Sequence, residues 1–483
     1  MSGIRVIVAG AGVGGLACAH RLLAQSRDRG IPLELAVLEA APRAGGVIAT
    51  DHVDGCVIEG GPDCFVSDKP WGIDLCRRAG LADEIVGTNP TLRRSFVYTR
   101  GALRPIPEGY QLLAPSRLLP FATTRILGLG GKLRAACDLV LPRGPDVPDE
   151  SLASFVRRRF GRETLDRLAQ PLLAGIYNAD PERLSLRATM PRFLELERRH
   201  RSVILGLLRA RRSLPAEART GVSGARYSIF VTLKTGLQTL TDRLAGSLPA
   251  GSLRLGARLL RLDAAPVSAA PAAARWRVSI SGGETLEADA VVLAAPACVA
   301  APLVRAFDPP LADLLAQIPY GGAATVSLAY RRADVSHPLD GFGFVVPRTE
   351  NRRLVACSFS SVKFPGRAPA DKVLLRAFLD GRTSDGVEPA HLERIVRDDL
   401  RDILGITASP LFARSYVHTA AMAQYEVGHL EVAQAVDDRL SRHGGLFVAG
   451  NGLRGVGLPD CVHSGEVAAD GVLARAGMVS LVR

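Results

Sequence analysis

The sequence predicts an α/β protein, in which a Rossmann-type nucleotide-binding domain is joined to an antiparallel-sheet domain and an inserted helical lobe. The chain opens with an apolar strand at 4–9, a glycine-rich turn and a helix, and a second apolar strand follows at 33–39. It closes on a strand at 446–450, which leads through another glycine-rich turn into a helix that starts near Pro459. Strand-like runs crowd the region 318–384 between these ends. Both ends of the chain are therefore expected in one nucleotide-binding domain.

The residues between these ends predict how the chain is divided. A length of 483 residues indicates more than one domain. We expect a discontinuous nucleotide-binding domain of residues 1–90, 228–300 and 440–483, a helical lobe of 91–227 that lines the substrate site, and a substrate-binding antiparallel-sheet domain of 301–439. Helices are predicted at 68–80, 131–140, 150–160, 163–173 and 190–210, and an exposed loop at 211–226. Asp149 is the expected N-cap of the helix at 150–160, and Gly161 is its expected stop.

Composition limits the partners. The net charge of +12 and the pI of about 9.7 indicate either anionic partners or an arginine-rich surface. The arginines are scattered, as in Arg157–Arg159, and no RNA-binding or helix-turn-helix signature accompanies them, so nucleic acid is not an expected partner. The eight cysteines form no Cys-x-x-Cys pair, which argues against a zinc site and disulfides and favours a reducing cytoplasm. No cleavable leader and no apolar stretch of spanning length is visible, which leaves peripheral membrane contact open.

The first glycine-rich turn has the form Gly10-x-Gly12-x-x-Gly15 and lies between a strand and a helix. Gly10 would permit the tight turn, Gly12 would let a pyrophosphate approach the backbone, and Gly15 would let the helix pack closely on the strand. The free N–H groups at the start of the helix would attract the phosphates. Glu39 ends the next strand, where a ribose would bind. The alternative is a glycine-rich turn without a ligand, but the position of Glu39 favours dinucleotide binding.

Two further motifs extend this pattern. Glu39-Ala-Ala-Pro-Arg43-Ala-Gly45-Gly46 resembles the motif that separates FAD-binding, amine-oxidase-like flavoproteins from nicotinamide dehydrogenases. Arg43 could neutralise a phosphate, and the alternative is a solvated turn. The C-terminal turn from Gly450 to Asp460 leads into a helix whose N-terminus could stabilise the negative charge of a reduced flavin ring. Two separated glycine-rich helix starts are expected when one long FAD spans the domain.

Over nearly its whole length the sequence resembles the oxygen-dependent porphyrinogen oxidases, flavoenzymes of the late haem pathway. The motifs that carry the resemblance are Glu59–Asp63 with Lys69, Gly131–Arg143, Pro171–Tyr177 with Leu184–Ser185, Gly341–Pro347, Lys363–Gly366, Gln424–Tyr425 with Gly428–Leu430, and Gly457–Cys461. The resemblance implies that FAD accepts hydride from a porphyrinogen, that dioxygen reoxidises the flavin to give peroxide, and that no metal takes part. It also implies FAD contacts at Gly10, Gly12, Val13, Gly14, Gly15, Glu39, Ala40, Arg43, Gly46, Val47, Gly60, Gly61, Pro62, Leu259, Ala295, Gly450, Asn451, Val456 and Gly457.

The resemblance also suggests residues on the substrate side. Asp63 and Lys69 match polar residues near the flavin in the Gram-positive-type enzymes and are the catalytic candidates. A carboxylate could orient or accept the proton of a pyrrole N–H, and a lysine could pair with a propionate. The alternatives are a helix cap for Asp63 and a solvated charge for Lys69. The walls of the substrate site would be apolar, and core packing is the alternative for these residues: Gly175, Ile176, Tyr177, Phe342 and Phe344.

One departure from the family pattern bears on the substrate. The mitochondrial and plastid-type enzymes have an Arg directly before an aromatic strand, whereas here Ser95 precedes Phe96 and Arg94 is displaced by one position. A shift of one residue on a strand turns the side chain to the other face. The sequence therefore favours coproporphyrinogen III as the substrate, with protoporphyrinogen IX as the alternative. Another amine-oxidase-like flavoenzyme and a non-catalytic FAD-binding protein are further alternatives. A ferrochelatase is an expected partner, and the expected location is the cytoplasm or the cytoplasmic face of a membrane.

Overall fold

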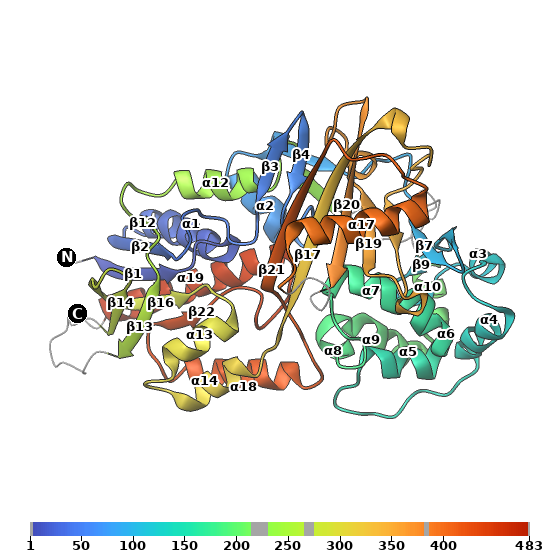
Figure 1. The fold of residues 1–483 in the computed structure, drawn as a ribbon. Coiled ribbons are helices and arrows are strands. Elements are labelled where there is room, and N and C mark those ends of the chain that lie inside the picture. Colours follow the sequence, from blue (N-terminus) through green and yellow to red (C-terminus); the bar gives the residue numbers. More distant parts are fainter. Residues whose placement is uncertain (1–2, 214–229, 265–274, 381–385, 482–483) are drawn as a thin grey trace.

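The computed structural model describes residues 3–213, 230–264, 275–380 and 386–481. The nucleotide-binding domain is built on a five-stranded parallel sheet in the order β12-β2-β1-β16-β22 (Figure 1). Its strands are β12 (Leu253–Leu255), β2 (Leu33–Glu39), β1 (Ile4–Ala9), β16 (Ala290–Leu293) and β22 (Leu446–Val448). Segments from the beginning, middle and end of the chain therefore meet in one sheet, and the predicted α/β fold class is confirmed.

Both faces of this parallel sheet are buried, which explains the continuous apolar runs of its strands. Val6 and Val8 of β1 pack in one core with helices α1 (Val13–Asp28) and α19 (Leu458–Leu481). Ile7 and Ala9 point to the opposite face and pack against a small sheet of β13 (Leu259–Ala264), β14 (Trp276–Ile280) and β15 (Thr285–Ala288). Since side chains alternate along a strand, the single run of β1 serves both cores.

A seven-stranded sheet forms the second large unit, in the order β21-β17-β20-β19-β18-β7-β8. Its strands are β21 (Phe412–Ala423), β17 (Tyr320–Arg331), β20 (Lys372–Asp380), β19 (Leu354–Phe359), β18 (Gly343–Val345), β7 (Phe96–Thr99) and β8 (Ala102–Pro105). All neighbours are antiparallel except β18 and β7. Helix α17 (Pro389–Leu404) covers one face, because Leu392, Val396 and Leu400 lie on one side of the helix.

The third unit is the helical lobe, which lies at the end of the molecule away from both termini (Figure 1). Buried side chains such as Phe155, Phe160 and Leu168 form its core. Its helices are α3 (Leu118–Thr123), α4 (Leu129–Ala136), α5 (Leu152–Phe160), α6 (Arg162–Thr164), α7 (Gln170–Tyr177), α8 (Leu186–Thr189), α9 (Pro191–His200) and α10 (Val203–Arg212).

Shorter elements complete these units. The helices are α2 (Pro70–Arg78), α12 (Gln238–Gly246), α13 (Ala297–Val304), α14 (Pro309–Ala316), α15 (Ser360–Lys363) and α18 (His429–Leu440). The strands are β3 (Thr50–Val53), β4 (Cys56–Glu59), β5 (Phe65–Val66), β6 (Ile85–Gly87), β9 (Tyr110–Gln111), β10 (Ala114–Pro115), β11 (Phe230–Leu233), β13 (Leu259–Ala264), β14 (Trp276–Ile280) and β15 (Thr285–Ala288). Strand β11 pairs with β5 and β6, so the chain is back beside the first domain at Phe230.

The structure corrects several expectations. Strands β7 and β8, expected within the helical lobe, instead extend the large sheet. Asp149 does not cap the helix at 152–160; Ser151 does, and Asp149 accepts a hydrogen bond from Ser185 at 2.7 Å. The helix expected at 190–210 is broken at Arg201, whose φ is +66°. Strand β21 and helices α17 and α18 were not predicted, and the loop expected at 211–226 lies largely outside the described residues.

Candidate active site

The turn after β1 has two glycines that accept no side chain and one that faces open space. A Cβ on Gly10, whose φ is +115°, would lie 2.3 Å from the carbonyl oxygen of Ala294. A Cβ on Gly15 would lie 1.9 Å from the carbonyl oxygen of Gly10. At Gly12, the N-cap of α1, a Cβ would meet no atom within 4 Å. The geometry therefore fits the predicted division of roles between turn, packing and ligand approach.

Glu39 links this turn to the next one. Its carboxylate accepts hydrogen bonds from the backbone N–H groups of Ala11 and Ala41, both at 2.8 Å. These bonds hold the carboxylate at the carboxyl edge of the parallel sheet, where ligands of such folds bind. A ribose hydroxyl would find an oriented acceptor at this position.

Arg43 binds its own turn. Its guanidinium donates to the carbonyl oxygens of Ala44, Gly46 and Ile48 at 2.7–3.0 Å. This turn also lies against the turn after β1, since a Cβ on Gly46 would be 3.4 Å from the Cα of Gly12. Arg43 thus shapes a loop next to the phosphate position, while direct neutralisation of a phosphate by Arg43 stays a prediction.

The C-terminal turn meets the first turn. A Cβ on Gly14 would lie 3.1 Å from the carbonyl oxygen of Cys461 and 3.7 Å from the Cα of Gly450. Gly450 has a φ of +121°, and a Cβ there would meet nothing within 4 Å. The three glycine-rich motifs therefore converge at one edge of the sheet and leave open space at Gly12 and Gly450.

Two tyrosines hold Asn451 in this turn. Tyr425 donates to the Asn451 carbonyl oxygen at 2.8 Å, and Tyr320 donates to its side-chain oxygen at 3.4 Å. The Asn451 amide donates to the carbonyl oxygen of Ala421 at 2.9 Å. Burial raises the pKa of Tyr320 to about 12, so this hydroxyl stays protonated and keeps its donor role at neutral pH.

Asp63 lies in an ion pair that the sequence did not reveal. Lys363 donates to its carboxylate at 2.8 Å, and Cys64 lies 3.0 Å from its other oxygen. Burial by itself would raise the pKa of Asp63, but the Lys363 ammonium and the Arg376 guanidinium outweigh it and hold the pKa well below its usual range. Such a carboxylate is a weak base, so Asp63 is better suited to orienting an N–H group than to removing its proton.

Lys69 is also paired. Its ammonium lies 2.6 Å from Asp460, which in turn accepts a hydrogen bond from the N–H of Gly457. The Lys69 side chain keeps 41% of its surface exposed, whereas Asp460 keeps 12%. Lys69 therefore connects α2 to the C-terminal turn, and a substrate carboxylate would have to compete with Asp460 for it.

The predicted apolar walls divide between two faces of the large sheet. A Cβ on Gly175 would lie 3.9 Å from Val345, so Val345 faces helix α7. Phe344 points to the other face and packs edge-on to Phe359 in the core under α17. Alternation along β18 turns Phe344 away from α7, and its assignment to the substrate wall stays a prediction.

The remaining candidates have less distinct environments. Phe342 is buried, and Ile176 and Tyr177 are half-buried at the end of α7. The carbonyl oxygen of Tyr177 accepts a hydrogen bond from Gln424 at 3.3 Å. These contacts place the end of α7 beside the start of the segment that leads to Asn451.

A family profile described as flavin containing amine oxidoreductase matches residues 13–473. The chain belongs to the flavin-containing amine oxidoreductases. The coproporphyrinogen III oxidase of Bacillus subtilis (strain 168) is 33% identical over 473 residues, which cover 97% of each chain. The mitochondrial protoporphyrinogen oxidase of Nicotiana tabacum is 28% identical over 499 residues, which cover 99% of this chain and 96% of that one. A crystal structure from Exiguobacterium sp. 255-15, provisionally assigned as a protoporphyrinogen oxidase, has a TM-score of 0.83 at 30% identity and covers 98% of this chain and 99% of that one.

This flavin-containing amine oxidoreductase is therefore an enzyme that binds FAD, and both predictions are confirmed. The residues present fit the cofactor: open space at Gly12 and Gly450 lets a ligand approach the backbone, and Glu39 offers an oriented carboxylate. Ala40 and Val47 are exposed beside these turns, while Leu259, Ala295 and Val456 are half-buried near the edge of the sheet. FAD would supply the hydride acceptor of the reaction.

Arg94, displaced by one position from the arginine of the family pattern, forms an ion pair with Asp340. Arg94 lies 3.1 Å from Asp340 and is half exposed, whereas the neighbouring Ser95 is buried. Whether Arg94 reaches a substrate propionate stays a prediction.

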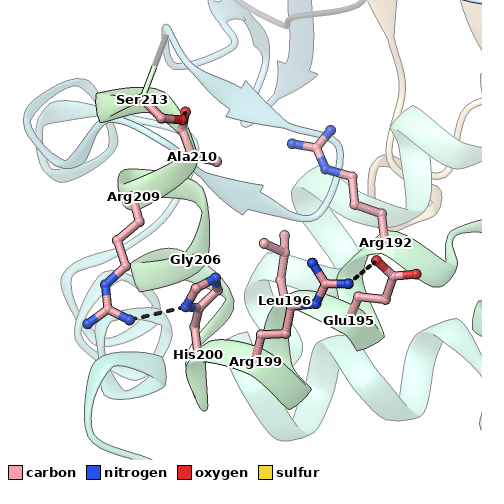
Figure 2. Close-up of a pocket in the computed structure, with 9 residues that line it drawn as sticks. All are labelled: Arg192, Glu195, Leu196, Arg199, His200, Gly206, Arg209, Ala210 and Ser213. Atoms are coloured by element: carbon pink, nitrogen blue, oxygen red, sulfur yellow. Dashed lines mark hydrogen bonds and ion pairs between the residues drawn. The ribbon is translucent and has the colours of Figure 1, made fainter.

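A separate pocket of about 370 Å³ lies between α9 and α10 and contains none of the predicted site residues (Figure 2). All three arginines that line it have partners: Arg192 donates to Gln111 at 2.8 Å, Arg209 lies 3.1 Å from His200, and Arg199 lies 4.0 Å from Glu195. Across the described parts of the oxidoreductase, no group of three or more His, Cys, Asp or Glu side chains is placed to hold a metal. Among the same residues we find no helix whose length and apolar character would let it span a bilayer.

Sequence reasoning missed Lys363, Arg376 and Tyr320 as neighbours of the site. Lys363 was noted only as part of a family motif, and Arg376 and Tyr320 lie in strands that are otherwise largely apolar. An arginine or tyrosine within a buried strand was the available signal, since such residues are rarely buried without a partner.

Proposed function

We propose that the protein oxidises coproporphyrinogen III to coproporphyrin III, with FAD as the hydride acceptor and dioxygen as the oxidant that is reduced to peroxide. The observation that supports this substrate is the similarity to the Bacillus subtilis coproporphyrinogen III oxidase over 97% of both chains. The Nicotiana tabacum protoporphyrinogen oxidase is similar over a comparable span at lower identity, 28% against 33%. Protoporphyrinogen IX is therefore the second candidate substrate.

The chain's own residues would hold and orient the macrocycle. Asp63 is ionised and held by Lys363, so it would accept a hydrogen bond from a pyrrole N–H without removing the proton. Lys69 would pair with a propionate in exchange for Asp460, since its side chain stays partly exposed. Helix α7 and the face of β18 that carries Val345 would contribute apolar contacts.

Side-by-side kinetics with the two porphyrinogens test the substrate. Coproporphyrinogen III should bleach the flavin anaerobically and should have the higher kcat/KM, by about tenfold, because one additional charge-assisted hydrogen bond contributes about 1.5–3 kcal/mol. Lys69→Met should lower kcat/KM for coproporphyrinogen III by about tenfold more than for protoporphyrinogen IX.

Asp460→Asn is the matched control, because it removes the partner of Lys69 and keeps the ammonium. If Lys69 only secures Asp460, both variants will slow both substrates equally. A clear preference of the parent for protoporphyrinogen IX would assign the second candidate instead. Failure of both porphyrinogens to bleach the flavin would indicate another amine-oxidase-like activity or a non-catalytic FAD protein.

We also propose that the helical lobe makes peripheral contact with an anionic lipid surface. Leu119 and Leu129 are each 75% exposed, on α3 and α4, and Leu133 and Val140 are exposed nearby. These helices lie at the far end of the lobe (Figure 1). Next to Leu119 an apolar pocket of about 410 Å³ is bordered by arginines: Arg117, Arg211 and Arg212. Exposed leucines bordered by arginines are typical of surfaces that bind anionic membranes.

Vesicle sedimentation tests this contact. The purified protein should sediment with vesicles that contain phosphatidylglycerol, should bind less as salt rises, and should not sediment with phosphatidylcholine alone. Leu129→Glu should reduce the bound fraction several-fold, while Leu260→Glu, at an exposed position on β13, should leave it unchanged. Equal binding of both variants would contradict the proposed surface.

Two expectations about cellular context stay predictions. Contact with a ferrochelatase would pass the porphyrin product to an enzyme that inserts metal. A cytoplasmic location, with or without membrane association, would place the protein where cysteines stay reduced.

A further inference from the structure

Five charged side chains gather where the large sheet meets the end of β4 and the segment after it; three of them are buried, and Asp63 and Lys363 keep only 18% and 12% of their surface exposed. We call Glu59, Asp63, Lys363, Arg367 and Arg376 the buried charge cluster. Lys363 pairs with Asp63 at 2.8 Å, and Arg367 pairs with Glu59 at 3.0 Å. Arg376 has no carboxylate at ion-pair distance among the described residues and donates instead to the carbonyl oxygen of Gly61. The cluster thus holds three cations and two carboxylates.

The excess positive charge of the cluster lowers the stability of the protein when no ligand is bound. Arg376 is 3% exposed, as is Arg367, and each has a buried N–H without a hydrogen-bond partner among the described residues: Nε of Arg376 and NH1 of Arg367. A buried charge without a counter-charge is strongly destabilising. Burial also raises the pKa of Glu59, against the attraction of Arg367, which can only increase the excess of positive charge. The protein therefore carries a fixed positive potential at this junction.

Neighbouring groups do not cancel this charge. His418 contacts the carbonyl oxygen of Gly60 at 3.0 Å and adds no negative charge. Tyr416 packs its ring on Gly60 and donates to Asp51, which lies at an exposed position of β3. Thr232 accepts from Arg367 at 2.5 Å and is neutral.

The buried charge cluster lies at residues 60–65, the segment that runs between two of the glycine-rich turns. A Cβ on Gly61 would lie 1.9 Å from the carbonyl oxygen of Val47, in the turn that contacts Gly12. At the other end, a Cβ on Gly72 would lie 3.0 Å from the ring of Phe65 and 3.2 Å from Pro459 at the start of α19. Residues 60–65 therefore run from the dinucleotide turn towards the C-terminal turn, along the length that one FAD would occupy.

We propose that the buried charge cluster stabilises the reduced, anionic form of FAD and so sets the flavin potential, with Arg376 as the decisive positioning residue. Reduction adds two electrons to the ring; N5 takes up one proton, and the ring keeps one negative charge. In turnover the porphyrinogen supplies the electrons and the proton as hydride. The net positive charge of the cluster lies on the protein in both states, but it attracts only the ring that has become negative.

The test measures the midpoint potential of the FAD-loaded protein by slow anaerobic reduction beside a reference dye, with no porphyrinogen present. Arg376→Gln removes the excess cation and should lower the potential; Asp63→Asn raises the net charge of the cluster by one unit and should raise the potential. One unit charge acting across roughly 10 Å at an effective dielectric of about 20 changes the ratio of reduced to oxidised flavin about tenfold. For a two-electron couple this change is ~30 mV.

The double variant Asp63→Asn/Arg376→Gln restores the parent charge, so its potential should return close to that of the parent. Arg376→Lys keeps the charge and alters the bond to Gly61, so it should stay near the parent value. Flavin content and thermal unfolding show whether each variant is folded and loaded. Shifts of both single variants in one direction, or no shift in either, would overturn the proposal. Because no porphyrinogen is used, an error in the substrate assignment leaves the result unaffected.

Discussion

Gly12→Val is expected to fold and to lose its FAD. Gly12 has a φ of −69°, which any residue adopts, and a Cβ there would meet no protein atom within 4 Å. The added side chain would therefore occupy only the space in which the pyrophosphate approaches the start of α1. We expect FAD affinity to fall by at least about 100-fold, or roughly 2.7 kcal/mol. Flavin absorbance per protein after gel filtration, with circular dichroism as the measure of folding, checks this result.

Gly15→Ala is the matched control for this prediction. A Cβ at Gly15 would lie 1.9 Å from the carbonyl oxygen of Gly10, so this variant should lose stability rather than only its cofactor. A folded Gly12→Val protein that retains stoichiometric FAD would show that the phosphates bind elsewhere.

Arg159→Ala is expected to destabilise the protein by about 3–5 kcal/mol, because it leaves the carboxylate of Asp138 buried without its counter-charge. The side chains of Arg159 and Asp138 are 2% and 0% exposed. The guanidinium also donates to the carbonyl oxygens of Pro142 and Arg201, at 2.7 and 2.9 Å. Removing it would therefore loosen three segments of the helical lobe together. The midpoint of denaturant unfolding, followed by far-UV circular dichroism, measures the loss of stability.

Arg157→Ala provides the control two residues away. Arg157 pairs with Glu182, but both side chains are about half exposed. Exposed ion pairs contribute about 0.2–1 kcal/mol, so the unfolding midpoint should hardly change. If the two alanine variants have the same unfolding midpoint, the Asp138–Arg159 pair does not stabilise the lobe to the extent that its burial predicts.

The glycine-rich turns could be predicted from the sequence because each depends on few neighbouring residues. A strand, a Gly10-x-Gly12-x-x-Gly15 turn and a helix must follow one another in the chain, and Glu39 follows at a typical spacing. Backbone sterics impose these glycines locally, so their pattern remains readable without the fold. The fold class, the flavin and the parallel sheet followed from these short segments.

The arginine run 157–159 shows what the sequence left open. It suggested a solvated basic face, yet one arginine is exposed, one bridges Glu150 and Glu197, and Arg159 is fully buried. Helical periodicity turns neighbouring residues to different surroundings, and the surroundings come from distant parts of the lobe.

The charged groups around Asp63 also come from distant parts of the chain. Its partner Lys363 lies 300 positions along the chain, and Arg376 reaches Gly61 from β20 in the large sheet. Likewise, only the register of β18 between β19 and β7 determines that Val345 faces α7 and Phe344 does not. The sequence by itself determined the elements whose causes are local, namely the turns, the cofactor class and the apolar strands. Which charges pair, and which face of a sheet a side chain lies on, depend on which distant segments pack together. That packing is determined by the free energy of the whole folded chain.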